Sequence, residues 1–153
     1  MTGSVWVLSM SQLYRNFGIQ FRYPEKWTLN EEEGDEEQVT ITVMRDPACF
    51  WSLTLLAERP APEEVLDEAL DAYQEEYPDV EVREVKATIA RRPAVAIDVD
   101  FFCMELCNTA HLRAFQSEQH TLFVMYQVTD HEEGETYPEF DEITKSLEVD
   151  LPA

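Results

Sequence analysis

Residues 94–130 constrain the fold more than any other stretch, because apolar and polar side chains alternate there in successive runs. Residues 95–101 and 122–128 both have this two-residue period, which is typical of a strand with one buried face. Residues 112–117 form a less regular run between them, and the polar residues 117–120 predict a hairpin turn. A parallel pair needs a crossover of a dozen or more residues. The sequence therefore predicts an antiparallel meander.

Further strands and two helices are predicted around this meander. Pro62 suits the first turn of a helix, and Leu66, Leu70 and Tyr73 recur at helical spacing, so a helix is expected over residues 60–77. A second helix is expected to begin at Pro138. Strands are predicted at residues 18–23, 27–29, 39–44, 50–57 and 80–89. This order predicts an α+β fold, a twisted antiparallel sheet of about six to seven strands with helices packed on its faces.

The length of 153 residues favours one domain, and 44% hydrophobic residues are enough for an ordinary core. We expect residues 13–153 to form this domain, and residues 1–12 to be an extension or a poorly marked first element.

No apolar run is long enough for a membrane span, and no signal peptide is expected at the N-terminus. The three cysteines are an odd number without the spacing of a disulfide framework, which indicates free thiols in a reducing cytoplasm.

The formal net charge of −21 limits the classes of partner, because 32 acidic residues stand against 11 basic ones. Nucleic acids and anionic membrane surfaces both attract Lys and Arg, so neither is expected to bind this chain. The acidity is compatible with a basic protein partner, with cation binding or with a saline habitat. The simplest alternative is a surface that is only well solvated. No cofactor is expected.

A family resemblance begins in residues 18–27 (GIQFRYPEKW), where an apolar strand is followed by Tyr-Pro, two further residues and Trp. This segment resembles the opening of the PsbP-like superfamily, which includes the extrinsic photosystem II subunit, a Ran-binding nuclear import factor and small bacterial proteins. The resemblance extends over residues 13–147 in the order of elements. Residues 93–94 match a family turn, but Arg91 and Arg92 precede them and its glycine is missing.

The resemblance implies a binding or assembly protein, because most members lack a shared active site. It also allows a chaperone role, since some similar bacterial proteins escort secreted effectors. No nucleophile elbow and no glycine-rich phosphate loop occurs in the sequence. The sequence thus favours a small acidic adaptor or chaperone domain without catalytic activity.

The predicted first helix carries the candidate binding surface. Like-charge neighbours four residues apart destabilise a helix by about 0.2–0.5 kcal/mol per pair. Three such pairs occur here, which a basic partner or high salt would compensate. The candidate binding residues, to which the acidic stretch 31–37 adds further charge, are Glu64, Asp67, Glu68, Asp71 and Glu75.

A second candidate is a metal- or thiol-dependent enzyme centred on Cys103, Cys107 and His111, with His120 as a further ligand. Zinc accepts Cys and His ligands in a tetrahedron, but a four-residue spacing throughout is not a standard zinc pattern. Cysteine is also commonly buried as a small apolar residue, which is the structural alternative. His131 begins a stretch that resembles a zincin motif, but the second histidine is missing, and Gly134 with Pro138 favours a loop there.

Overall fold

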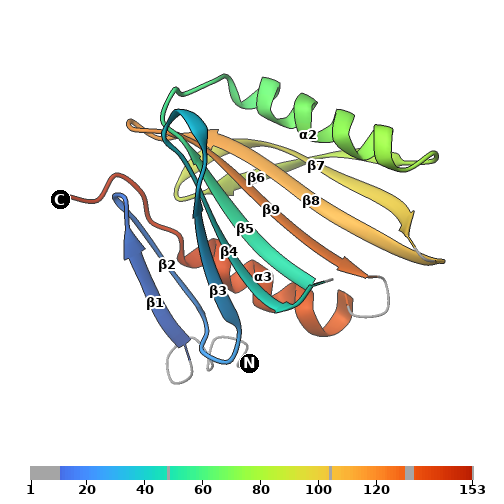
Figure 1. Ribbon diagram of the computed structural model, residues 1–153, viewed down its shortest axis with the longest axis horizontal. Helices are drawn as coiled ribbons and strands as arrows, with labels where there is room; N and C mark the ends of the chain where they lie inside the picture. The colour runs from blue at the N-terminus through green and yellow to red at the C-terminus, as the bar shows by residue number, and fades with distance from the viewer. Residues whose placement is uncertain (1–10, 48, 104, 130–132, 153) are drawn as a thin grey trace.

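The computed structural model describes residues 11–47, 49–103, 105–129 and 133–152. Nine strands, two α-helices and one short 3-10 helix follow one another in this part of the chain (Figure 1). The elements are β1 (Ser11–Asn16), β2 (Ile19–Pro24), β3 (Thr28–Glu33), η1 (Asp35–Glu37), β4 (Gln38–Asp46), β5 (Cys49–Leu56), α2 (Pro62–Glu76), β6 (Glu81–Ile89), β7 (Arg92–Cys103), β8 (Leu106–Gln116), β9 (Thr121–Thr129) and α3 (Glu133–Ser146).

Seven strands form one antiparallel sheet in the order β3-β4-β5-β9-β8-β7-β6, which confirms the predicted α+β class. Strands β1 and β2 pair separately as a two-stranded hairpin. Helix α2 packs on one face of the large sheet, against β7, β8 and β9. Helix α3 lies on the opposite face between β9 and the β1–β2 hairpin (Figure 1).

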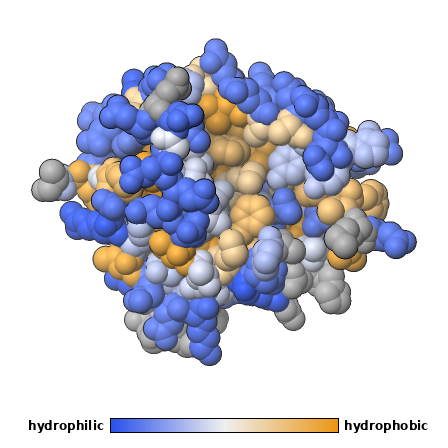
Figure 2. All heavy atoms as spheres, in the orientation of Figure 1, coloured by the Kyte–Doolittle hydropathy of each residue, from blue (hydrophilic) through white to orange (hydrophobic). Residues whose placement is uncertain are grey.

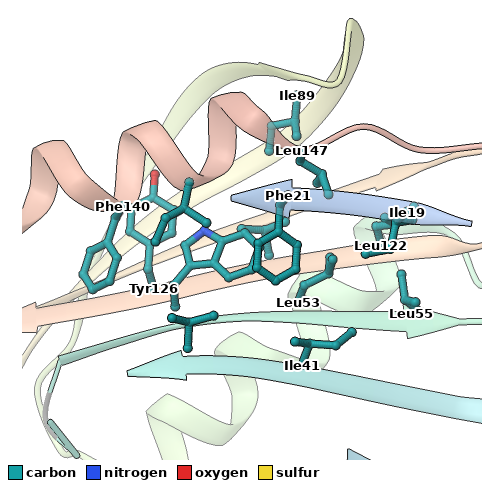
Figure 3. Packing of buried hydrophobic residues seen from close by; sticks show 14 of the residues in the cluster. Ile19, Phe21, Ile41, Leu53, Leu55, Ile89, Leu122, Tyr126, Phe140 and Leu147 are labelled. Carbon is teal, nitrogen blue, oxygen red and sulfur yellow. The ribbon is translucent and has the colours of Figure 1, made fainter. Parts of the chain in front are cut away.

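Each face of the sheet has its own apolar core, as the two-residue period requires. The core on the α3 side contains Trp51, whose indole packs against Phe21 and donates a hydrogen bond of 3.0 Å to Thr144 Oγ1 of α3. In the same core, the ring of Tyr126 packs against Phe140 (Figure 3). The smaller core on the α2 side contains the following buried residues: Leu66, Val99, Phe101, Ala110, Leu112 and Ala114.

Three elements differ from the sequence predictions. Strand β8 begins at Leu106 rather than at residue 112, because β7 and β8 form a long hairpin through the polar Asn108. Helix α3 begins at Glu133, so Pro138 lies inside the helix instead of opening it, and the loop predicted there is wrong from Glu133 onward. The acidic residues 31–37, whose run of charges predicts a loop, do not form a continuous loop. Their first part pairs with β4 as strand β3, and their last part forms η1.

The turn between β6 and β7 contains two residues in an uncommon conformation. Ile89 pairs with Arg92, so only Ala90 and Arg91 lie in the turn. Their φ angles are 51° and 66°, the left-handed values that a type I′ hairpin turn requires. This turn normally contains Asn and Gly, because a Cβ atom destabilises the left-handed conformation. A glycine would suit this turn, but both of its positions, Ala90 and Arg91, carry a side chain.

Replacing Arg91 with glycine should stabilise the fold. We expect Arg91→Gly to raise the free energy of unfolding by about 1 kcal/mol, since glycine adopts a positive φ without a steric penalty. Arg91→Ala is the matched control, because it removes the same side chain but keeps Cβ, and it should change stability little. Denaturant unfolding followed by tryptophan fluorescence would measure both. Equal stabilisation by the two variants would contradict this explanation.

Candidate functional site: an acidic helix beside an apolar groove

Helix α2 begins at Pro62 and places its apolar stripe on the sheet. Leu66 is buried beneath it, and the rings of Tyr73 and Tyr77 pack against Phe101 of β7 with centroids 5.0 and 4.4 Å away. Burial raises the pKa of Tyr73 to about 12, and its hydroxyl donates a hydrogen bond of 3.0 Å to Gln127 of β9. These contacts fix the rotation of the helix, and so determine which side chains face solvent.

The five candidate carboxylates of α2 project away from the sheet. At 100° per residue they fall within one narrow sector of the helix, opposite the stripe that contains Leu66. All five are exposed. No basic residue occupies the last turn, so Glu75 also lies at the negative end of the helix dipole, where a carboxylate is unfavourable. The resulting surface, comprising Glu64, Asp67, Glu68, Asp71 and Glu75, is called the acidic face below.

An apolar groove borders the acidic face. Helix α2 covers β7, β8 and β9, which leaves part of β5 and its neighbours open on this side of the sheet. A cavity of about 640 Å³ lies there, between Val65, Glu68 and Ala69 of the helix and the sheet residues Leu56 and Phe123. Figure 2 shows this apolar surface as a hollow between hydrophilic ridges. The groove therefore combines an apolar floor with an acidic rim on the helix side.

The acidic stretch 31–37 leads toward the opposite rim of the groove. Its successor Gln38 begins β4 and lines the same cavity as Glu68. The side chains of Glu31, Glu32 and Glu33 in strand β3 are exposed. Glu31 accepts a hydrogen bond from the hydroxyl of Tyr14, which together with burial raises the pKa of that tyrosine. Glu31 and Glu33 pair with Ile41 and Val39, whose side chains lie in the core on the α3 side, so these two carboxylates point away from the groove. The acidic residues that line the groove are Glu58 and Glu68.

The second candidate site is not assembled by the fold. Cys103 pairs with Leu106 in the β7–β8 hairpin, and Cys107 pairs with Phe102, so the two thiols point to opposite faces of the sheet. His120 lies in the turn after β8, roughly 30 Å along the strand from Cys107. Within the described residues, no three His, Cys, Asp or Glu side chains are grouped to hold a metal ion. His131 lies outside the described residues.

His111 instead belongs to a buried network that the sequence analysis did not identify. Asp98 Oδ1 lies 2.9 Å from His111 Nδ1 and accepts a hydrogen bond of 2.8 Å from Arg113 Nη1. All three residues are at least 90% buried on the α3 face of the sheet, and the His111 ring stacks on Tyr126. Burial alone would raise the pKa of Asp98, but the hydrogen bonds from His111 and Arg113 lower it to about 2.

No family model and no curated protein matches this sequence. Solved structures do match. Cyanobacterial PsbP from Synechocystis superimposes with a TM-score of 0.60 over 92% of this chain and 93% of its own, at 12% identity. The fold is PsbP-like.

Two other solved structures share this PsbP-like fold. LpqN of Mycobacterium tuberculosis, described as involved in cell envelope biogenesis, has a TM-score of 0.55 at 16% identity and covers 94% of this chain and 91% of its own. A Bacteroides thetaiotaomicron protein has a TM-score of 0.58 at 12% identity over 92% of this chain. The chain spans only 48% of that protein. At these identities the likeness concerns the fold, and the site must be argued from the residues of this chain.

Two observations on this PsbP-like domain bear on its surroundings. Among the helices of the described residues, none is both long and apolar enough to cross a bilayer. The cysteines at positions 49, 103 and 107 are not joined by disulfides, and Cys49 is fully buried in the core on the α3 side.

Acid titration tests the buried network. Because the pKa of Asp98 falls from an ordinary 3.8 to about 2 on folding, the stabilisation it provides is complete above about pH 4 and disappears as the pH falls toward 2. We expect Asp98→Asn to lower the free energy of unfolding at pH 6 by about 3 kcal/mol, since it leaves Arg113 buried without its counter-ion. The difference from the wild type should narrow between pH 4 and pH 2.

The exposed carboxylate of Asp141, which pairs with Lys145 at 2.9 Å, supplies the control. Asp141→Asn should cost less than about 1 kcal/mol, because exposed ion pairs contribute little. Denaturant unfolding at several pH values would measure both variants. A deficit in Asp98→Asn that stayed constant from pH 6 to pH 2 would contradict the assignment.

Proposed function

We propose that this PsbP-like chain is a non-enzymatic adaptor or chaperone domain that binds a basic amphipathic segment of another protein. The acidic face of α2 would contact the Lys and Arg residues of this segment, and the neighbouring groove would accept its apolar side chains. The observation that carries the proposal is that the exposed acidic face borders an apolar groove, which Glu68 of that face lines together with Val65 and Ala69. Three cysteines that form no disulfide support a reducing compartment such as the cytoplasm.

The groove has the properties of a peptide-binding surface. Amphipathic helices bind in grooves through apolar side chains that recur every three or four residues. The groove is lined by Leu56, Val65, Ala69 and Phe123, which offer contacts of this type. Charge complementarity then determines the partner, because a segment rich in acidic residues would be repelled by Glu68 at the rim.

The composition of α2 also supports a binding role over a purely structural one. Asp71 lies four residues from both Asp67 and Glu75, so it takes part in two repulsive pairs. A single basic residue at this exposed position would relieve both. The acidic residues of this face are therefore better explained by a partner, or by a saline environment, than by the stability of the helix.

A synthetic basic amphipathic peptide of alternating Lys and Leu clusters, labelled with a fluorophore, tests the proposal directly. We expect it to bind at low salt and to dissociate as salt is raised. The triple variant Asp67→Asn, Asp71→Asn and Glu75→Gln should weaken binding roughly tenfold, because each exposed ion pair contributes about 0.2–1 kcal/mol. Fluorescence anisotropy would give the dissociation constants.

The matched control removes three exposed carboxylates outside the acidic face through Glu25→Gln, Glu81→Gln and Glu118→Gln. It changes the net charge by the same amount and should bind the peptide almost as the wild type does. Equal weakening by the two triple variants would show that only net charge matters, and would refute the acidic face as the site. The natural partner would then be sought by capture from the native lysate, with the two triple variants as competing baits.

Stability measurements distinguish an acidic surface that binds a partner from one that is adapted to high salt. At low ionic strength, Asp71→Asn should raise the free energy of unfolding by about 0.5–1 kcal/mol, since it removes two repulsive pairs. The gain should disappear near 1 M salt, where the Debye length is about 3 Å. Glu25→Gln should show no gain. A protein adapted to salt would instead be stabilised steeply by salt overall and would bind no basic peptide.

A further inference from the structure

The face of the sheet opposite α2 contains a cavity with an unusual charge. It has a volume of about 630 Å³ and lies between β2, the C-terminal end of α3 and the edge strand β6. Of the 11 basic residues in the chain, five line this cavity, whereas only two acidic residues of the described ranges do. The basic residues are Arg22, Lys86, Arg91, Arg113 and Lys145. A protein of net charge −21 thus has a locally positive cavity.

Arg113 is the buried cation of this cavity. Its side chain is 9% exposed, and its Nη1 atom donates hydrogen bonds to Asp98 and to the carbonyl oxygens of Ile97 and Leu112. Within the described part of the chain, Nη1 makes all the hydrogen bonds of this guanidinium. The Nε and Nη2 donors are therefore available, and the guanidinium lies over the ring of Tyr126, which also lines the cavity.

Two further arginines at the cavity have no carboxylate partner among the described residues. Arg22 is half-buried, and the hydrogen bond of its Nη1 goes to the neutral Ser11 hydroxyl at 3.2 Å. Arg91 is exposed in the left-handed turn between β6 and β7. With almost three acidic residues for every basic one, cations without a counter-ion are unexpected in this chain.

Lys86 and Thr88 line the cavity from strand β6, but they pair with Val95 and Pro93, so their side chains point to the α2 face. Several other polar groups of the cavity already have partners. Asp141 pairs with Lys145 at 2.9 Å, and Glu148 accepts a hydrogen bond of 3.1 Å from Gln20. The hydroxyl of Ser146 donates to the carbonyl oxygen of Ile143 and accepts the backbone N–H of Arg22. The guanidinium groups are therefore the donors that remain for a ligand. Their planar fork of N–H groups matches the oxygens of a phosphate or a carboxylate.

We propose that this cavity binds a small organic anion that carries phosphate or carboxylate groups. Arg113 would contact the anion from the floor of the cavity, and Arg22 and Arg91 would contact it from opposite sides of the entrance. The volume lies within the range of about 300–1,000 Å³ that is usual for small-molecule sites. The site is separate from the acidic face, since the sheet lies between them.

Binding of two simple probes, inorganic phosphate and citrate, tests the proposal at constant ionic strength by isothermal titration calorimetry. We expect at least one probe to bind the wild-type chain with one site per molecule. The tighter probe identifies whether phosphate or carboxylate groups are preferred. Arg22→Gln and Arg91→Gln should each weaken binding about tenfold, because each removes a charge-assisted hydrogen bond to the anion.

Arg45→Gln is the matched control. Arg45 lies outside the cavity and pairs with Asp46, and its replacement alters the net charge by the same amount. It should bind the probes as the wild type does. The proposal is refuted if neither probe binds, or if Arg45→Gln weakens binding as much as the two cavity variants do. The acidic-face variant Asp71→Asn should leave probe binding unchanged, which separates this site from the proposed function.

Arg91→Gly provides an independent check on folding artefacts. It is expected to make the chain more stable, for the reason given for the β6–β7 turn, and yet to bind the anion about tenfold more weakly. A variant that gains stability and loses affinity cannot owe the loss to unfolding. Wild-type affinity in Arg91→Gly would remove Arg91 from the site.

Discussion

The antiparallel pairing of β7, β8 and β9 is the constraint on which both proposed surfaces depend. Strand side chains alternate between faces, so a slip of one residue would turn Asp98, His111 and Arg113 toward α2 and expose apolar positions on the other side. In the observed register, the α2 face is apolar along β7 and β8, which lets the helix pack there. The same register gathers the buried charges on the α3 face. One pairing thus positions the helix with its acidic face and also the floor of the basic cavity.

The buried network connects this architecture to the cavity. Asp98 pairs with Arg113 through the Nη1 atom of the guanidinium. The Nη1 side of the group is therefore occupied, whereas Nε and Nη2 are available to a ligand. Breaking such a pair costs far more than the pair itself stabilises, because an uncompensated charge remains buried. The network is therefore a poor solution for stability alone, but it holds a desolvated cation in a defined orientation. Small-anion recognition needs that combination.

The fold was largely predictable from the sequence, but the sites were only partly so. The two-residue period of residues 95–101 and 122–128 determined the meander, and the stripe of Leu66, Leu70 and Tyr73 determined which side of α2 is exposed. By contrast, no local pattern relates Asp98 to Arg113, because their contact follows from strand pairing across fifteen residues. The regular spacing of Cys103 and Cys107 suggested proximity, yet the hairpin turn between them places the thiols on opposite faces. The available signal in the sequence was a charged residue between apolar ones in each of two neighbouring predicted strands, Asp98 in one and Arg113 in the other.

Among the positions that disagree with local structural preference, two belong to the proposed surfaces. Arg91 adopts a left-handed conformation that favours glycine, and it lines the basic cavity. Asp71 has like charges on both sides along the helix, and it lies at the centre of the acidic face. Stability alone favours other residues at both positions, and each change would need a single substitution. Residues that break local rules are expected where function requires them. Their separate location, on opposite faces of one sheet, favours two distinct binding activities over a single extended one.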